Sequence, residues 1–395
     1  RSRIDRHLLR PLTFALHRAH RAALGHPRVV VVGVVLVVAG VLPQVPNMRV
    51  HLSIREMIDP QMTAATDLSR MEASFGAAHP FVIVFRPPDG TDGFSGEQAR
   101  ALAEWIDGCG RRADVRRIRS PLQVVGVVED GEGLHAEPRI ADLTPASLER
   151  LVGTPWQGVV TDEDCRDVAV EIVLRESSHS TRFGRFDPAP VGELLASARA
   201  DFADRYQGVE VYGAGAAAFE YHSLEGIRRF RLLNVAVVAL LLLFARLALG
   251  TWRAGPLLLL PLGVASAVVY GGMALRGDPI DLLSTGLFLL LAVAGIEDFF
   301  FLSRLRMESG RRWRGAFRRL LLPGFLTSLT TVLGFGSLLA SDLEIVRRLG
   351  LWAALGALVE WTATFLVLPA VLELVPPARD WTDRRRAWRI DSLEL

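Results

Sequence analysis

The segment AVAGIEDFFFLSR, residues 292–304, places two adjacent carboxylates, Glu297 and Asp298, in a stretch that is otherwise apolar enough for lipid. An ionisable side chain in a bilayer core costs roughly 3 kcal/mol even on lenient insertion scales, so it usually faces the protein interior and serves ion or substrate movement. A low dielectric raises the pKa of a carboxyl group towards neutral pH, where the group can take up and release a proton. We therefore predict that Asp298 and Glu297 belong to a proton relay.

Helical geometry separates these two acids. Gly295 and Asp298 are three residues apart and share one helix face, and the glycine lets another helix approach closely. Glu297 points about 100° away, so it needs a different partner or a different role. The alternative is structural, because both acids precede Arg304 and Arg306 by one or two turns and can pair with them.

Other polar groups occur in the two apolar runs that follow. The sequence FLTSLTTVLGFG contains Thr327, Thr330 and Thr331, whose hydroxyls are expected either to support the relay through water or to bond to their own helix backbone. Glu360 lies near the middle of the last apolar run, with no arginine beside it. We predict that Glu360 is a third member of the relay.

Several kinds of chemistry have no visible motif. The sequence lacks a GxxxxGK[ST] phosphate cradle, so ATP is not expected to be the direct energy source. It also lacks HExxH, CxxC and GxSxG, and its nine histidines are scattered without ligand spacing. We expect no enzymatic reaction, no cofactor and no metal. The basic residues cluster at segment ends, so no nucleic acid is expected as a partner.

The elements that must position these acids are membrane-spanning helices. Half of the 395 residues are apolar, and runs long enough to cross a bilayer are evident. The first run is short, and its long basic leader favours an uncleaved anchor over a signal peptide. The six predicted transmembrane helices are 29–42, 232–249, 256–275, 282–302, 320–340 and 349–374.

Arginine placement predicts the orientation. Arginines are concentrated in the leader, residues 1–28, in the loop after the fourth run and in the tail, residues 375–395. These segments share one side if every run spans, and the positive-inside rule makes that side cytoplasmic. The alternation in IDRHLLRPLTFAL predicts an amphipathic helix on the inner membrane surface, with a solvated leader as the alternative.

Residues 43–231 have ordinary soluble composition and are predicted to form an extracytoplasmic domain. Its pattern is strand, helix, strand, strand, helix, strand, which predicts a ferredoxin-like α+β fold. Residues 125–166 form an expected insertion with a short helix. Cys109 and Cys165 both fall in this domain, where one disulfide bridge is possible. The predicted elements are 80–85, 94–112, 115–124, 167–174, 190–206 and 209–215.

These features together resemble one half of a resistance-nodulation-division (RND) exporter, most closely the MMPL and Patched-like branch with its sterol-sensing-type helices. GIEDFFFL, residues 295–302, looks like the fourth-span motif of that branch. LTSLTTVLGFGSLLASDLEIVRRLG and LVLPAVLEL look like its fifth and sixth spans, and VEVYGAGAAAFEYHSLEGIRR is similar to the stretch before the second. The likeness covers nearly the whole sequence.

The resemblance implies proton-driven export of a hydrophobic or lipid-like substrate from the bacterial inner membrane through a porter domain, with Asp298 as the proton-relay acid. Family members usually carry two such halves, so the resemblance also implies a homodimer or a second half-transporter. Glu360 has no counterpart in this likeness. The alternatives are a lipid-responsive sensor or assembly partner without transport, and a helper of protein translocation built on the same half-fold.

Overall fold

The computed structural model describes residues 10–50, 79–130, 133–175, 187–249, 254–309 and 313–375, with a few isolated positions between them. The chain divides into two compact units, residues 51–226 and residues 1–50 with 227–395. The start of the predicted leader, part of the loop after the fourth predicted span, and the tail from residue 376 lie outside the described residues.

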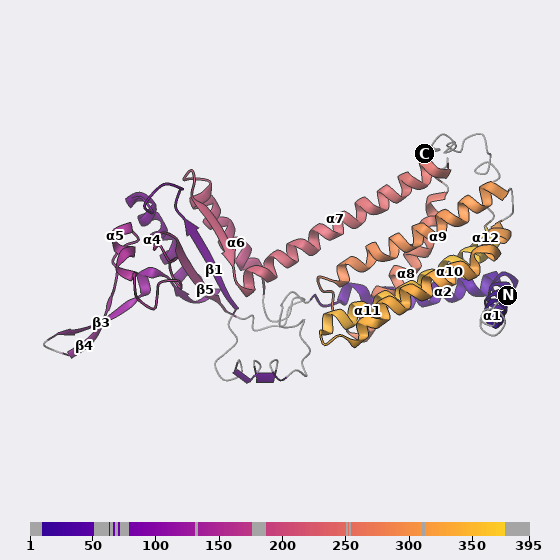
Figure 1. Ribbon diagram of the computed structural model, residues 1–395, viewed down its shortest axis with the longest axis horizontal. Helices are drawn as coiled ribbons and strands as arrows, with labels where there is room; N and C mark the ends of the chain where they lie inside the picture. Colours follow the sequence, from indigo (N-terminus) through magenta and orange to yellow (C-terminus); the bar gives the residue numbers. More distant parts are fainter. Residues whose placement is uncertain are drawn as a thin grey trace. The chain divides into compact units, whose positions relative to one another are not determined.

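The first unit to consider, residues 51–226, contains a small antiparallel sheet with helices. Each strand and helix expected from the sequence is found within a few residues of its predicted position. The elements are β1 (His79–Arg86), α4 (Gly96–Gly110), β2 (Val115–Arg119), β3 (Val125–Asp130), β4 (Gly133–Pro138), α5 (Pro145–Leu148), β5 (Val168–Leu174), α6 (Ala189–Ala198) with a π turn η6 (Arg199–Ala203), and β6 (Glu210–Ala214) (Figure 1).

Four strands form one sheet in the order β2-β5-β1-β6, and every neighbouring pair is antiparallel. The central pair is in register from His79 opposite Leu174 to Phe85 opposite Val168. The predicted insertion contains the separate hairpin β3–β4 as well as the short helix α5. The hairpin is an addition to the predicted pattern.

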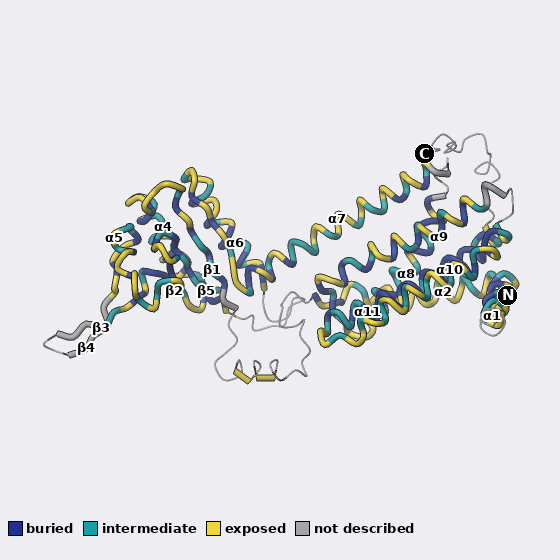
Figure 2. The backbone as a smooth tube through the Cα atoms, in the orientation of Figure 1, coloured by how far each residue is buried: buried dark blue, intermediate teal, exposed yellow. Residues whose placement is uncertain are grey.

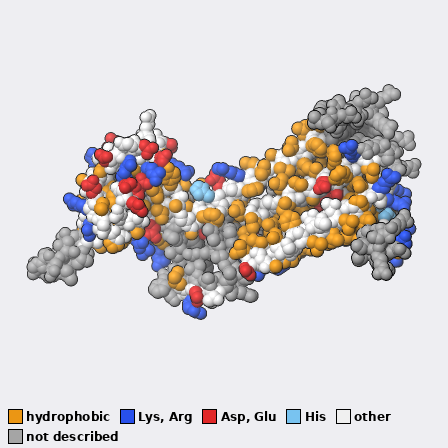
Figure 3. All heavy atoms as spheres, in the orientation of Figure 1, with side chains coloured by type: hydrophobic (Ala, Val, Ile, Leu, Met, Phe, Trp, Pro, Cys, Tyr) orange, Lys and Arg blue, Asp and Glu red, His pale blue; other side chains and the backbone are white. Residues whose placement is uncertain are grey.

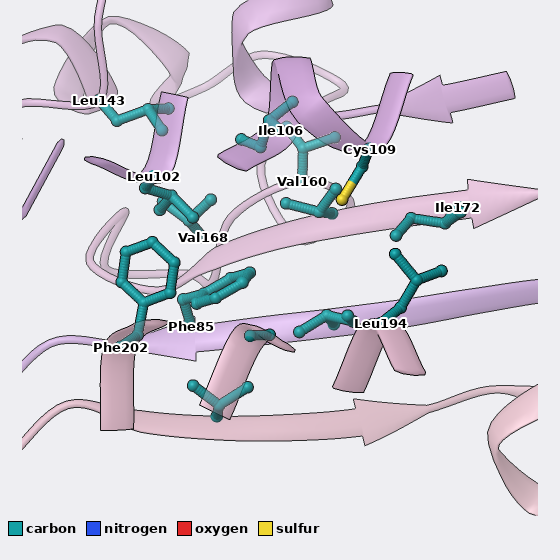
Figure 4. Packing of buried hydrophobic residues seen from close by; sticks show 14 of the residues in the cluster. Phe85, Leu102, Ile106, Cys109, Leu143, Val160, Val168, Ile172, Leu194 and Phe202 are labelled. Carbon is teal, nitrogen blue, oxygen red and sulfur yellow. The ribbon is translucent and has the colours of Figure 1, made fainter. Parts of the chain in front are cut away.

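One core joins the sheet to its helices. Phe81, Ile83 and Phe85 alternate along β1 and are fully buried, which is the period-two burial expected of a strand with one covered face. Figure 4 shows Phe85 beside Phe202, with Leu102, Ile106 and Leu194 from the helices around the same strands. The ring centroids of Phe85 and Phe202 are 5.0 Å apart in an edge-to-face arrangement.

Helix α4 begins where its sequence predicts. Ser95 accepts a hydrogen bond from the backbone N–H of Gln98, and the Gln98 side chain accepts one from the backbone of Ser95. This reciprocal capping box satisfies two of the backbone donors that a helix start leaves open.

The two cysteines are both buried and both free. The structure therefore does not form the disulfide that the sequence allowed. Burial raises the pKa of the Cys109 thiol to about 12, so little of it is present as the reactive thiolate at neutral pH.

The second unit is a bundle of long helices. Its elements are α1 (Arg10–Gly25), α2 (Pro27–Val41) with the 3₁₀ turn η2 (Leu42–Asn47), α7 (Ala216–Leu249, which begins in the other unit), α8 (Ala254–Arg276), the turn η7 (Ser284–Gly286), α9 (Leu287–Ser309), α10 (Trp313–Gly336) with η8 (Ser337–Ala340), α11 (Glu344–Thr362), the π turn η9 (Ala363–Val367) and α12 (Leu368–Leu374).

Six helical segments among the described residues are long and apolar enough to cross a membrane, and they coincide with the six predicted runs. Exposed large apolar side chains line them, as on α2 and α7, so their outer surface suits lipid. The last segment, α11 to α12, is the most buried, with 67% of its apolar window inside the structure. Figure 2 shows the dark buried positions running along α11.

The ends of this bundle differ from the expected domain boundary. Met48 and Val50, which the sequence assigned to the extracytoplasmic domain, are buried in the helical unit. Val50 pairs with Ile280, whose N–H donates to the carbonyl of Arg49 at 2.8 Å. The backbone after α2 is thus held by the loop that follows α8.

The described part of the leader forms helix α1, in line with the expected helix and not with a solvated leader. Leu16, His20 and Ala23 are buried. These residues lie on one helix face, and α1 contacts α10, η9 and α12. The apolar stripe of α1 is therefore covered by protein.

We predict that Phe85→Ala opens the sheet unit, because truncating a fully buried phenylalanine costs about 3 to 5 kcal/mol. The rate at which N-ethylmaleimide labels the buried Cys109 and Cys165 in the intact protein should rise at least tenfold. Val152→Ala is the matched control, since Val152 is exposed and surface truncations rarely exceed about 0.5 kcal/mol. Equal labelling rates in the two variants would contradict the assigned core.

Candidate functional site

Two carboxyl groups from the fourth and sixth spans are brought together. Asp298 lies halfway along α9, and Glu360 lies near the end of α11 with only 1% of its surface exposed. The hydroxyl of Thr364, which is fully buried, donates a hydrogen bond of 2.8 Å to Oε1 of Glu360. Glu360 and Thr364 are one turn apart, so the bond joins two residues on the same face.

Two glycines create the space for these acids. A Cβ at Gly295 of α9 would lie 3.2 Å from Oε1 of Glu360, so the missing side chain admits the carboxylate of α11. A Cβ at Gly324 of α10 would lie 2.6 Å from the ring of Phe365 and 3.7 Å from Oδ1 of Asp298. The three helices α9, α10 and α11 therefore meet around the two carboxyls.

The close helix approach predicted at Gly295 occurs, but the group that fills the space was not predicted. The sequence indicated a close helix approach next to Asp298, and the approach occurs. The group that occupies the space is the carboxylate of Glu360, which the sequence could not pair with any particular residue.

The pair is electrostatically coupled. The charge of Asp298 acts on Glu360. Two carboxylates in one apolar site repel, and such groups titrate as a coupled pair instead of independently. The arrangement can therefore hold one proton between two helices and change the force between them when that proton leaves.

Glu297 lies on another face of α9, although its charge acts on Asp298. It is exposed, as are Val293 and Phe301, which lie one turn before and one turn after it on the same face of α9. The structure confirms the expectation from helical geometry that the adjacent acids have different surroundings. Arg304, the expected partner in the structural alternative, is also exposed.

The threonine hydroxyls of α10 bond to the backbone of their own helix, which was one of the two expectations for them. Thr327 donates to the carbonyl of Pro323 at 3.1 Å, and Thr330 and Thr331 both donate to the carbonyl of Thr327, at 2.7 and 3.1 Å. Thr327 and Thr330 are exposed. These hydroxyls are committed to their own helix, whereas Thr364 supplies the hydroxyl at Glu360.

A single face of the sixth span carries several of its polar groups. Residues four apart stack on one face of a helix, and here each member of the series is buried. At the middle of the series, a Cβ on Gly356 would lie 2.8 Å from Leu291 of α9 and 3.3 Å from Val269 of α8. A closely packed apolar layer thus separates the two polar ends. The series is Arg348, Trp352, Gly356, Glu360 and Thr364.

At the Arg348 end of this face, two aspartates contact α11. Nε1 of Trp352 donates to Oδ2 of Asp278 at 2.8 Å. Nη1 of Arg348 lies 3.7 Å from Oδ2 of Asp281, and Oδ1 of Asp281 accepts from the backbone N–H of Ser284 at 2.8 Å. Asp281 is 2% exposed. These contacts tie α11 to the loop that begins the fourth span.

Thr364 and Phe365 are site residues that the sequence interpretation missed. Thr364 had a usable signal, because it follows Glu360 by one turn. Phe365 had none, because its role depends on Gly324 of another helix. Phe365 also stacks on Trp361, with ring centroids 5.7 Å apart.

We predict a graded response to adding a methyl group at three glycines. Gly263→Ala should leave the melting temperature of the purified protein nearly unchanged, because nothing lies within 4 Å of the new carbon. Gly295→Ala should lower it slightly and Gly324→Ala most, since overpacking costs about 1 to 3 kcal/mol and the contacts at these sites are 3.2 and 2.6 Å. Thermal unfolding followed by size-exclusion chromatography measures the series. A different order would contradict the packing around the two carboxyls.

Comparison with known proteins places this arrangement in a family. The model of the MMPL family matches residues 108–391, which is well over half of the chain and includes α7 to α12 with both buried carboxyls. A search of curated proteins finds no match to the chain. With its six candidate spans and a matched region of this extent, the chain belongs to the MMPL family of the RND superfamily.

Proposed function

We propose that this protein is a proton-driven exporter that moves a hydrophobic or lipid-like substrate outwards from the inner membrane. Membership of the MMPL family supports an RND-type transporter of hydrophobic substrates. The observation that carries the proton coupling is the pairing of Asp298 and Glu360 at the contact of α9, α10 and α11. The proposal involves no covalent catalysis, cofactor or metal.

Repulsion between the two carboxylates of the pair supplies the force that moves the helices. With one proton bound, α9 and α11 stay together through the contact at Gly295. Loss of that proton leaves two repelling charges in an apolar contact, which favours a different helix arrangement. The packed layer at Gly356 closes the route towards Arg348. The described arrangement therefore corresponds to a state in which the pair is shut off from that end.

The sheet unit serves as the porter domain in this proposal, with a ferredoxin-like fold. Two interleaved strand-helix-strand units produce a four-stranded antiparallel sheet in which the two units alternate. The order β2-β5-β1-β6, with α4 and α6 as the connecting helices, fits that description. The β3–β4 hairpin and α5 then form an insertion between the two halves of the pattern.

Charge supports cytoplasmic termini. Arginines lie on α1 and at the start of α10, and α1 contacts α10 and α12. Figure 3 shows basic atoms gathered at the α1 end of the helical unit. The positive-inside rule places that end in the cytoplasm, so Arg348 and Asp281 face the opposite side and the sheet unit is extracytoplasmic.

A hydrophobic substrate has an entry point among the described helices. Phe244 of α7, Leu258 of α8 and Phe299 of α9 line an apolar hollow of about 20 Å³, which is room for roughly one water. The hydroxyl of Ser303 also lines it and is buried without a hydrogen bond among the described residues. We propose that acyl or ring groups enter here when α7 moves away from α9.

A second transporter half is the expected partner. The exposed face of α9 contains Val293, Glu297 and Phe301, so a carboxylate stands within an otherwise lipid-compatible stripe. A charge facing lipid is costly, whereas a protein partner can cover it. We propose that another copy of this chain, or a related half, packs on this stripe.

The decisive test is the membrane lipid profile of a deletion strain. The native chain should restore a lipid class that accumulates without it. Asp298→Asn and Glu360→Gln should fail to restore it, because each variant keeps only one carboxyl, so proton release no longer produces two repelling charges. The matched control is Glu297→Gln, which changes the neighbouring carboxyl outside the pair and should restore the profile as the native chain does. Immunoblotting must show equal membrane levels.

Other outcomes separate the alternatives. If Asp298→Asn restores the profile fully, the pair is structural and the proton-coupled proposal fails. If the deletion changes no lipid, the lipid-sensor and protein-translocation readings replace export.

Cross-linking tests the partner. In a background with Cys109→Ser and Cys165→Ser, Val293→Cys should form a cross-linked dimer in native membranes when a short bifunctional maleimide is added. Val35→Cys is the control, because it lies on the lipid-facing surface of α2 and is equally exposed. Dimer formation at Val35 alone, or at neither position, would argue against a partner on the α9 stripe.

A further inference from the structure

A proline interrupts the sixth span next to the carboxyl pair. In an α-helix the carbonyl of Phe365 would accept from the N–H of residue 369, and that residue is a proline without a donor. The span forms the π turn η9 at this point before α12 begins. A backbone carbonyl that loses its donor is unfavourable in apolar surroundings, so a donor from another element stabilises the break.

His20 of α1 supplies that donor. Its Nδ1 lies 2.9 Å from the carbonyl oxygen of Phe365, across 345 positions of sequence. A carbonyl can only accept, so Nδ1 carries the hydrogen and the neutral ring leaves Nε2 as an acceptor. The ring is 1% exposed and tilted against Phe317 at 6.2 Å between centroids. Within the described residues, Nε2 makes no hydrogen bond.

The same short turn holds the site described above. Thr364 precedes Phe365 and donates to Glu360. The ring of Phe365 fills the space over Gly324, where Asp298 also lies. A shift of the Phe365 backbone therefore changes the surroundings of both carboxyls.

We propose that His20 is a positioning residue for the Asp298–Glu360 pair, because it completes the proline break of the sixth span and so holds Thr364 and Phe365 in place. The inference rests on the proposed proton coupling and adds to it: α1 is the element on the cytoplasmic side whose docking sets the geometry of the pair. We assign His20 no part in moving a proton between Asp298 and Glu360, since its hydrogen bond goes to a backbone carbonyl and not to either carboxyl.

Docking depends on the charge of His20. Burial lowers the pKa of His20 from its usual 6.5, the hydrogen bond to Phe365 opposes that shift, and His17 and Arg318 lower it further. The docked form thus prefers the neutral ring, so docking is fully stabilised above about pH 6.5 and weakens as the pH falls below it. The π turn η9 contains no ionisable residue. His17 lies on α1 itself. The other elements that contact α1 carry Arg28 on α2, Arg314, Arg318 and Arg319 on α10, and Glu373 on α12. Glu373 pairs with Arg314.

Hydrogen exchange of the full-length protein in lipid nanodiscs tests this inference. Peptides covering α1 and residues 357–375 should exchange faster as the pH falls from 7.5 to 5.5, at least threefold after correction for the intrinsic pH dependence of exchange. His20→Asn keeps an amide donor near the position of Nδ1 but cannot titrate, so both peptides should stay protected across this range. His20→Phe keeps the ring and loses the donor, so both should exchange quickly even at pH 7.5.

His17→Phe is the matched control. It makes the same change one turn away on the same helix, where the ring bonds to the carbonyl of Thr13. It should keep residues 357–375 protected at pH 7.5 and retain a pH-dependent loss of protection, which starts at a somewhat higher pH because His17 no longer lowers the pKa of His20. If His20→Phe and His17→Phe protect residues 357–375 equally, or if His20→Asn retains the pH dependence, the inference is overturned.

The lipid assay separates this result from the transport proposal. His20→Phe should lose restoration of the lipid profile and His20→Asn should retain it. Restoration by His20→Phe, together with failure of Asp298→Asn, would reject the positioning role and leave proton coupling intact. Restoration by Asp298→Asn would reject the coupling, whatever the His20 variants do.

Discussion

The helical unit depends on one constraint: a polar group inside an apolar bundle is costly unless it finds a partner within that bundle. Glu360 is the clearest case, because its carboxylate is almost fully buried and has Thr364 as its hydrogen-bond partner. The carbonyl of Phe365 is the second case. The residue four positions later, Pro369, has no N–H to donate to it, and the ring of His20 donates instead. Both contacts involve adjacent residues of the π turn η9, Thr364 and Phe365, in the most buried of the six candidate spans.

Close packing turns these local contacts into a connected set. Gly295, Gly324 and Gly356 each stand where a side chain of a neighbouring helix fills the missing volume. Such contacts leave little room for gradual deformation, so interfaces of this kind tend to exchange between discrete arrangements. A change in charge at Asp298 or Glu360 would therefore be felt along α9, α10 and α11 together.

Much of the fold could be predicted from the sequence, because its signals are local. Hydrophobic runs placed the six long helices, and alternation placed the strands of the sheet unit. The site was only partly accessible. Asp298 and Glu360 were recognisable as charges in apolar runs, but their proximity depends on how α9 and α11 pack. The contact of His20 with Phe365 joins residues near opposite ends of the chain, and no local pattern announces it. The threonines of α10 misled because hydroxyls suit water and backbone equally well.

The pairing of Val50 with Ile280 has a consequence for biosynthesis. Ribosomes extend a chain at roughly 5 to 20 residues per second, and roughly 230 residues separate these partners. The first span therefore waits roughly 10 to 50 s in the membrane before the loop that anchors it has been made. During that time α2 must be stable in lipid by itself. Its valine-rich sequence meets this need, since it has the highest hydropathy of the six candidate spans, and none of its apolar window is buried by the rest of the protein.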